Sequence, residues 1–301
     1  MSLQKIISDI QDLRIQGAEN TAKSALSALR EVVLSHKSTN VLSLVRDIAR
    51  AKTQLEKCRP TEPCLRNSLK YVVSHSKGNT FSELREAYLY NIQKSISELQ
   101  EAERSIARIG ALKIKNGMIV FTHCHSSTVT AVLKMAKQQE KQFVVHNTET
   151  RPNFQGRITA SELARAGIKV THFVDNAARF ALKQADIMLI GCDAFTSEGK
   201  VINKIGSELY AEICHRRDIP VYVCSTTWKF DPDTVFGFEE VIETRSKKEV
   251  WQNPPKNVTI DNHSFEIIDP ELITGMITEI GVYRPAVLVE EIRTRSPWMF
   301  S

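Results

Sequence analysis

Apolar and polar residues alternate at helical spacing over the first third of the chain. Near the start, Ile6, Ile10 and Leu13 recur every three or four residues, which is the period of a helix with one apolar face. Thr80 and Glu83 are spaced as in a capping box at the start of a long helix. The helices expected from this pattern cover residues 6–13, 17–26, 41–57, 65–76 and 81–109. We predict an N-terminal helical bundle.

After Gly110 the pattern changes to short apolar runs that alternate with helical segments. Strands are expected at residues 118–121, 142–146, 169–174, 187–190, 221–224 and 272–278. Helices are expected at residues 127–138, 159–166, 177–184 and 207–217. Such alternation is typical of βαβ units in a doubly wound sheet. We therefore predict an α/β protein with a helical domain over residues 1–112 and a Rossmann-like domain, with a mainly parallel sheet, over residues 113–301.

The proline- and asparagine-rich stretch 251–263 interrupts this pattern. It contains two adjacent prolines and neither an apolar run nor a helical period. We expect a long connection over the surface.

Composition and charge narrow the class of protein. Hydrophobic residues make up 42% of the 301 residues and charged ones 25%, as in ordinary globular proteins. The chain lacks an apolar run of the roughly 18 residues that a membrane span needs, and lacks a signal-peptide pattern, so we expect a cytoplasmic protein. The net charge of +5 fits a protein that binds phosphorylated small molecules. The sequence contains no basic run long enough to predict nucleic-acid binding.

The six cysteines are scattered without a CxxC pair. This spacing argues against both a disulfide framework and a structural zinc site. His123 and His125 flank Cys124, but a second cluster of histidines and cysteines at ligand spacing is missing. We expect the two histidines to be structural and the protein to need no metal.

Two polar clusters follow buried strands. Residues 122–127 come after the run 118–121, and residues 191–194 come after the run 187–190. Ligands of open α/β sheets bind outside the carboxyl ends of the strands. We therefore expect the thiol of Cys124 and the carboxylate of Asp193 to face each other across one pocket, with the neighbouring Cys192 pointing into the core.

The role of the Cys124 side chain can be interpreted in two ways. A nearby cation or a helix N-terminus lowers the pKa of a thiol, and both are available if a helix starts at Ser126 or Ser127. The alternative is that Cys124 is a small buried apolar residue, which is the usual case for a cysteine.

Three further strand ends present a cation. Arg151 and Gln155 lie in a strand-to-helix loop, Asn203 and Lys204 precede a helix, and Lys229 follows the strand 221–224. A guanidinium beside a helix N-terminus is a common way to hold an anion. The pattern indicates a phosphorylated ligand.

Four motifs carry a resemblance to a known family, and they occupy residues 122–126, 148–156, 175–178 and 203–206. The chain resembles the superfamily that joins the regulatory subunits of translation initiation factor 2B with isomerases acting on methylthioribose 1-phosphate and on ribose 1,5-bisphosphate. The resemblance runs from residues 14–18 to residues 277–282. It implies a Rossmann-like half, no metal or organic cofactor, and a homodimer or a hexamer of dimers.

The branches of that superfamily differ in one pair of residues. The isomerases carry a cysteine and an aspartate at two strand ends, and Cys124 and Asp193 stand at the matching positions. The resemblance therefore implies an aldose–ketose isomerase, most like the archaeal enzyme for ribose 1,5-bisphosphate. Cys124 and Asp193 would share the acid and base roles, with Asp193 kept protonated by an apolar site. The alternatives are a non-enzymatic initiation-factor-like subunit that binds a nucleotide or sugar phosphate, and a methylthioribose 1-phosphate isomerase.

One segment departs from the pattern of the bisphosphate isomerases. Their Arg-Gly-Ala-Gly segment becomes residues 16–19, Gln-Gly-Ala-Glu, in this chain. Gln16 keeps hydrogen bonds but lacks the charge of the phosphate-binding arginine, and Arg14 or Arg59 would compensate. The substrate-binding residues that the resemblance implies are Arg14, Gln16, Gly17, Ala18, Arg59, Arg151, Gln155, Asn203, Lys204 and Lys229.

Overall fold

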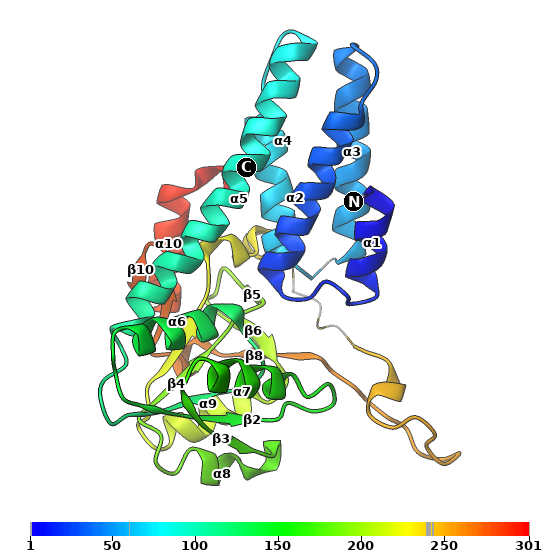
Figure 1. The fold of residues 1–301 in the computed structure, drawn as a ribbon. Helices are drawn as coiled ribbons and strands as arrows, with labels where there is room; N and C mark the ends of the chain where they lie inside the picture. The colour runs from blue at the N-terminus through cyan, green and yellow to red at the C-terminus, as the bar shows by residue number, and fades with distance from the viewer. Residues whose placement is uncertain (1, 60, 239–241, 243, 301) are drawn as a thin grey trace. The chain divides into compact units, whose positions relative to one another are not determined.

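The computed structural model describes residues 2–59, 61–238, 242 and 244–300. Packing divides the chain into two compact units (Figure 1). Unit 1 runs from the N-terminal helices to Glu101 and also includes Trp228–Phe230 and the segment from Arg295 onward. Unit 2 consists of Ala102–Thr227 and Asp231–Thr294. The domain boundary at residue 112 stays a prediction.

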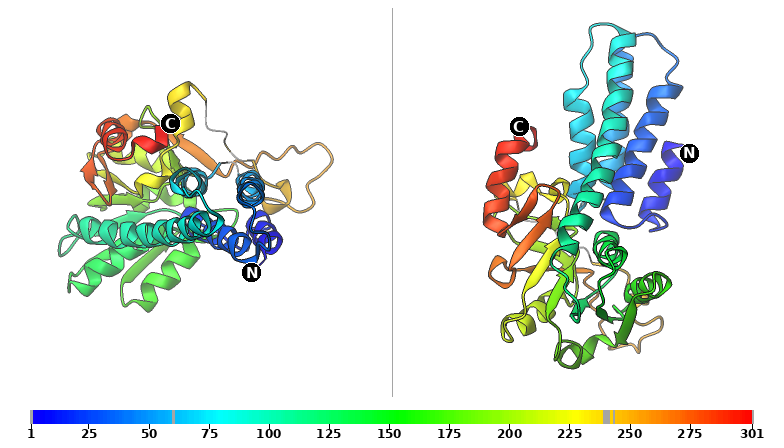
Figure 2. Two further views of the ribbon diagram at one scale, coloured as in Figure 1. Left: turned by 90° about the horizontal axis from the view of Figure 1, so that it is seen from above. Right: turned by 60° about the vertical axis from the view of Figure 1, so that its left-hand side comes forward.

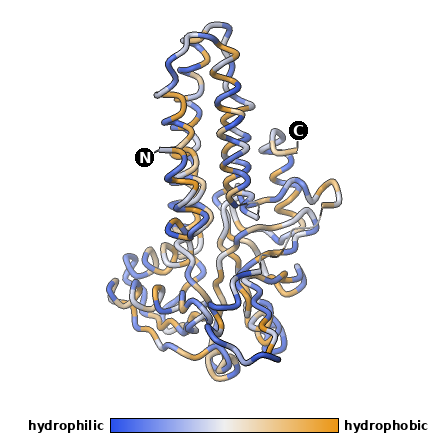
Figure 3. The backbone as a smooth tube through the Cα atoms, turned by 90° about the vertical axis from the view of Figure 1, so that its right-hand side faces the viewer, coloured by the Kyte–Doolittle hydropathy of each residue, from blue (hydrophilic) through white to orange (hydrophobic). Residues whose placement is uncertain are grey.

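Unit 1 is helical, as the spacing of apolar residues predicts. Ser2 and Asn40 cap two of its helices by accepting from Lys5 N and Ser43 N, at 3.4 and 3.1 Å. The capping box is also present, because Thr80 Oγ1 accepts from Glu83 N at 3.3 Å while Glu83 accepts from Thr80 N. Along the helices, apolar and polar segments alternate (Figure 3). The helices are α1 (Leu3–Gln11), α2 (Ala18–Ser35), α3 (Val41–Cys58), α4 (Pro63–His75) and α5 (Phe81–Ala111), of which α5 continues past Glu101 into unit 2.

Two segments from far along the chain complete the core of unit 1. Asn67 Nδ2 donates to the carbonyls of Trp228 and Phe230, at 2.9 and 2.8 Å. The ring of Tyr71 packs against those of Trp228 and Trp298, with centroids 5.5 and 5.2 Å apart. The sequence pattern does not predict these contacts, because they join residues more than 150 positions apart.

Unit 2 contains a seven-stranded sheet in the order β10-β9-β7-β4-β1-β2-β3 (Figures 1 and 2). Six strands are parallel, and only the edge strand β10 is antiparallel to its neighbour β9. The doubly wound, mainly parallel sheet is therefore confirmed. Its strands are β1 (Ile119–Thr122), β2 (Val144–Thr148), β3 (Lys169–Phe173), β4 (Ile187–Ile190), β7 (Val221–Cys224), β9 (Gly275–Thr278) and β10 (Gly281–Tyr283).

Helices cover both faces of this sheet. Val120 on β1 packs into an apolar core with Val132 on α6 and Leu163 on α7. Its neighbour Phe121 points the other way, as alternation along a strand requires, and its ring lies 5.0 Å from that of Tyr210 on α9. The helices are α6 (Ser127–Gln138), α7 (Gln155–Arg165), α8 (Ala178–Ala181), α9 (Ser207–His215) and α10 (Pro285–Arg295).

A second, three-stranded antiparallel sheet was not predicted. It consists of β5 (Ala194–Phe195), β6 (Val201–Lys204) and β8 (Phe265–Ile268), in the order β5-β6-β8. The strands are two to four residues long, and β6 pairs with β8, which follows it about sixty positions later in the chain. This sheet matters for the site because β5 begins directly after Asp193 and β6 ends at Lys204.

Other expectations need small corrections. The helix expected at residues 177–184 shortens to α8, and the strand expected at 272–278 begins only at Gly275, after a 3-10 turn over Pro270–Leu272. The long connection is confirmed, since residues 251–262 form neither helix nor strand and are mostly exposed. Over the described part of the chain, each helix is too short or too polar to cross a bilayer.

We expect Gly156→Ala to destabilise unit 2 strongly. A Cβ at this position, on the first turn of α7, would lie 1.7 Å from the carbonyl oxygen of Thr148, so strand and helix would have to separate at a cost of about 1–3 kcal/mol or more. Gly117→Ala is the control, because a Cβ there meets nothing within 4 Å and adds only the strain of a left-handed backbone. Urea unfolding of both variants measures the difference, and an equal loss for the two would contradict the packing argument.

Candidate active site

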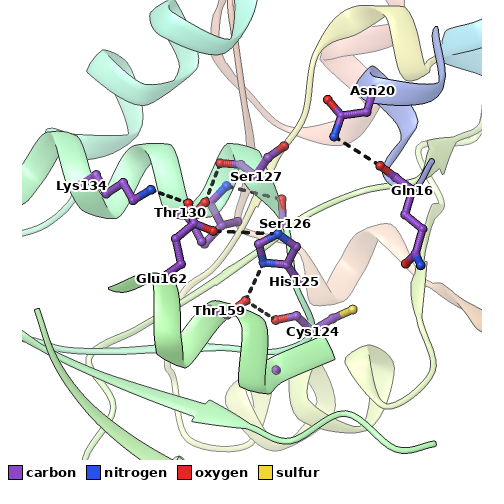
Figure 4. Close-up of polar contacts among 12 residues, drawn as sticks. Gln16, Asn20, Cys124, His125, Ser126, Ser127, Thr130, Lys134, Thr159 and Glu162 are labelled. Atoms are coloured by element: carbon purple, nitrogen blue, oxygen red, sulfur yellow. Dashed lines mark hydrogen bonds and ion pairs between the residues drawn. The ribbon is translucent and has the colours of Figure 1, made fainter. Parts of the chain in front are cut away.

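Cys124 lies two residues after the end of β1, in a left-handed backbone conformation with φ 65°. Residues with a Cβ rarely adopt this conformation without support. Both of its peptide groups have side-chain partners. Cys124 N donates to Thr150 Oγ1 at 3.0 Å, and Figure 4 shows Thr159 Oγ1 donating to Cys124 O, at 2.9 Å. The strand-end cysteine is therefore fixed by threonines from a loop and from α7.

The loop after β2 is held in turn from β3. Thr150 also has a left-handed backbone, with φ 61°. Its amide and that of Arg151 donate to the two carboxylate oxygens of Asp175, at 2.8 and 2.7 Å. Asp175 follows β3, so three neighbouring strand ends are linked in one hydrogen-bonded chain.

Asp193 follows β4, which is the parallel neighbour of β1 on its other side. The two strand ends approach closely at Gly191, where a Cβ would lie 2.7 Å from both Cβ and Oγ of Ser126. Asp193 is partly exposed, and its amide donates to Ile202 O at 2.9 Å. Only glycine at position 191 lets the loop after β1 lie against the end of β4.

Burial controls the protonation of Cys124. The thiol is 8% exposed, and burial raises its pKa to about 11, with the charges of Asp193 and Asp175 acting in the same direction and Lys204 opposing them. Lys204 lowers this pKa, as a nearby cation should, but burial is the larger effect and the net change is upward. The same result shows that Asp193, Lys204 and Asp175 all lie close enough to act on the thiol.

The two histidines beside Cys124 are held in the interior. His123 Nε2 donates to Ile205 O at 2.9 Å, and its Nδ1 accepts from the hydroxyl of Thr148. Burial lowers the pKa of His123 to about 4, so the ring is neutral at physiological pH. Burial also lowers the pKa of His125, whose Nδ1 lies 3.0 Å from Thr159 Oγ1. Within the described residues, no three His, Cys, Asp or Glu side chains are grouped to hold a metal ion.

The other predicted ligand residues of unit 2 lie at its strand and helix ends. Lys204 Nζ sits 4.7 Å above the ring of Phe265, its register partner on β8. Asn203 is buried, and its Nδ2 donates to Ser207 Oγ at 3.0 Å. Gln155 is the first residue of α7, and Arg151 is exposed, with its guanidinium 5.1 Å from the ring of Phe154.

Arg59 and Lys229 belong to a buried polar cluster of unit 1. Arg59 pairs with Glu62 at 3.1 Å, and Lys229 is 6% exposed. Burial raises the pKa of the Cys64 thiol, Glu19 and Glu62 raise it further, and Lys229 lowers it. The carboxylate of Glu19 is paired with Lys23 at 3.3 Å. Glu19 thus has a cationic partner within this cluster.

The remaining predicted residues form the connection between α1 and α2. Arg14 is exposed and pairs with Asp12 and, at 3.2 Å, with Asp9. Gln16 is exposed, and its Nε2 donates to Leu13 O at 2.8 Å. Gly17 is the N-cap of α2 with φ 84°, a conformation that favours glycine, and Ala18 is buried.

Sequence reasoning missed the residues that hold Cys124. Thr150 and Asp175 lie inside the motifs at residues 148–156 and 175–178. Nothing in the spacing of these motifs shows that the carboxylate of Asp175 would accept from two amides of the other loop. For Thr159 the sequence pattern predicts only the start of a helix. In the structure it lies in the second turn of α7, where its side chain faces the strand-end loop.

Known proteins resemble this chain in sequence and in fold. The profile of the Initiation factor 2 subunit family matches residues 14–285. A ribose 1,5-bisphosphate isomerase from Thermococcus kodakarensis is 35% identical, with 98% of this chain and 94% of that protein aligned. A methylthioribose-1-phosphate isomerase from Fervidobacterium nodosum is also 35% identical, over 83% of this chain and 76% of that protein. The crystal structure of a translation initiation factor eIF-2B from Pyrococcus horikoshii OT3 has a TM-score of 0.83 at 28% identity, covering 95% of this chain and 98% of that one.

The fold and the site define an α/β protein in which the polar residues of the site lie at the carboxyl ends of a parallel sheet. The chain belongs to the initiation factor 2 subunit family, which confirms the resemblance drawn from the motifs.

We expect alkylation of Cys124 by iodoacetamide to rise about tenfold per pH unit between about pH 7 and 9.5 without levelling off, because only the thiolate reacts and the pKa is about 11. Mass spectrometry of the Cys124 peptide measures the rate, with glutathione as the solution reference. A plateau near pH 8 would show that the thiol is not shielded as the structure indicates.

Proposed function

We propose that the protein is an aldose–ketose isomerase that converts ribose 1,5-bisphosphate to ribulose 1,5-bisphosphate. The observation that supports this proposal is that Cys124 and Asp193 follow the adjacent strands β1 and β4, with the charge of Asp193 acting on the thiol. The 35% identity to the Thermococcus relative of that name, over nearly the whole chain, supports the choice of substrate.

The reaction needs one proton donor and one acceptor. Opening the furanose ring breaks the bond between C1 and the ring oxygen, which takes up a proton. One hydrogen moves from C2 to C1, and the C2 hydroxyl loses its proton as the ketone forms, so the two proton transfers balance. A donor and an acceptor on neighbouring strand ends can serve both steps.

The roles follow from the protonation of Cys124. A thiol with a pKa of about 11 holds its proton at neutral pH, so Cys124 enters the cycle as the donor. Asp193 is partly exposed rather than enclosed in an apolar site as the resemblance implies, and we assign it the acceptor role. Lys204 and Arg151 would bind phosphate oxygens, and Asn203 and Gln155 the sugar hydroxyls.

Assembly and location belong to the same proposal. The family resemblance supports a homodimer or a hexamer of dimers, and the sequence pattern supports a cytoplasmic location. Light scattering on the purified chain measures the mass of the assembly.

We expect Cys124→Ala and Asp193→Asn each to lower kcat on ribose 1,5-bisphosphate by about 10²-fold or more, because each removes one proton-transfer group. Cys214→Ala, a change at another buried cysteine on α9, is the matched control and should keep kcat within about threefold. Methylthioribose 1-phosphate is assayed in parallel.

Two outcomes of this assay would change the conclusion. Turnover of methylthioribose 1-phosphate alone would identify the other isomerase of the family. Binding of a sugar phosphate or nucleotide without turnover of either sugar would favour a regulatory subunit like those of the initiation factor. The Gln-Gly-Ala-Glu sequence at residues 16–19 resembles that branch of the superfamily.

We expect Gln16→Arg to lower KM for ribose 1,5-bisphosphate about tenfold, because it restores a charge-assisted hydrogen bond to phosphate. Gln11→Arg, which adds the same charge at the end of α1, controls for the general effect of a cation. An equal decrease in KM from both changes would remove Gln16 from the substrate site.

A further inference from the structure

Thr159 is the one side chain that contacts both residues of the Cys124–His125 pair among the hydrogen bonds of the described residues. Its Oγ1 lies 2.9 Å from Cys124 O and 3.0 Å from His125 Nδ1 (Figure 4). We propose that Thr159 is a positioning residue, which fixes the backbone of Cys124 and the tautomer of His125 so that the thiol keeps one orientation at the end of β1. The effect on catalysis rests on the isomerase function proposed above.

The directions of the two hydrogen bonds follow from the donors and acceptors available. A carbonyl oxygen only accepts, so the single hydroxyl hydrogen of Thr159 is donated to Cys124 O. The hydroxyl oxygen must then accept from His125, which requires a hydrogen on Nδ1. His123 has the opposite tautomer, because its Nε2 donates to Ile205 O. Two histidines separated by one residue therefore carry their hydrogens on different ring nitrogens.

The helix and the apolar core hold the side chain of Thr159 rigidly in place. It is 1% exposed, and its β-branched side chain has few rotamers on a helix. Leu163, one turn later on α7, is packed in the apolar core of the sheet. The threonine hydroxyl is thus held by the helix and the core, and the loop after β1 is held by the hydroxyl.

The far side of the His125 ring faces a second residue of α7 without a hydrogen bond to it. Glu162 lies one turn from Thr159 and approaches His125 Nε2 at 3.9 Å. Lys134 of α6 is paired with that carboxylate, and burial lowers the pKa of His125. At neutral pH the ring is therefore neutral, and its single hydrogen is the one directed at Thr159.

Cys124 needs such support because its backbone is left-handed. Thr150 Oγ1 holds its amide and Thr159 Oγ1 holds its carbonyl. Removing one of these partners lets the peptide rotate toward ordinary φ values. Rotation about that peptide moves the thiol relative to Asp193, and misplacements of about 1 Å cost proton-transfer enzymes about 10²-fold in rate.

The test compares Thr159→Val, which keeps the shape of the side chain and removes the hydroxyl, with Thr159→Ser, which keeps the hydroxyl. We expect Thr159→Val to lower kcat by about tenfold to a hundredfold with KM changed less than about threefold, and Thr159→Ser to restore most of the rate. Thr278→Val is the matched control, since that buried threonine also donates to a backbone carbonyl, Gly281 O at 2.9 Å, on β9.

Two readouts do not depend on activity. In nitrogen-15 spectra we expect the wild-type His125 ring to be the Nδ1–H tautomer, and Thr159→Val to shift it toward Nε2–H. The alkylation rate of Cys124 should increase several-fold in Thr159→Val and stay unchanged in Thr278→Val. If the wild type proves to have no isomerase activity, the proposed function fails while these readouts still decide the positioning.

Three results would overturn the proposal. The first is a wild-type His125 that carries its hydrogen on Nε2, a measurement that needs no variant to fold. The second is unchanged alkylation of Cys124 in Thr159→Val. The third is a loss of kcat no larger in Thr159→Val than in Thr278→Val.

Discussion

The left-handed backbone of Cys124 is the constraint on which the strand-end site depends. It is maintained by a chain of hydrogen bonds that runs from Asp175 to the amide of Thr150, and from Thr150 Oγ1 to the amide of Cys124. Each link comes from a different strand of the sheet. The parallel order of β1, β2 and β3 therefore does more than form a core, because only neighbouring parallel strands bring these three loops together at one edge.

Burial raises the pKa of the Cys124 thiol more than the nearby cation lowers it. The pKa of Cys124 rises from 9.0 to about 11, which corresponds to roughly 3 kcal/mol in favour of the protonated form. Lys204 opposes this shift but does not overcome it. A protonated, shielded thiol is a poor nucleophile and resists oxidation, so the site suits proton transfer better than covalent catalysis.

The sequence pattern predicts the helical unit, the main sheet and the placement of Cys124 and Asp193, because long periodic helices and buried apolar strands carry strong local signals. It misses the sheet that includes β6 and β8, whose strands are four residues long and pair across sixty positions. It leaves open whether the pKa of Cys124 is lowered by charge or raised by burial, since burial is a property of the packed molecule. The positions of Thr159 and Asp175 could not be predicted for the same reason: their partners lie on other loops.

The division of the chain into units has a consequence for the order of folding during synthesis. The core of unit 1 includes Trp228, held through Asn67, and Trp298 against Tyr71. The ribosome delivers these tryptophans long after α1–α5 have emerged. The core of unit 1 therefore stays incomplete until the sheet of unit 2 has been synthesised. This order is the reverse of the usual one, in which the N-terminal part of a protein folds first.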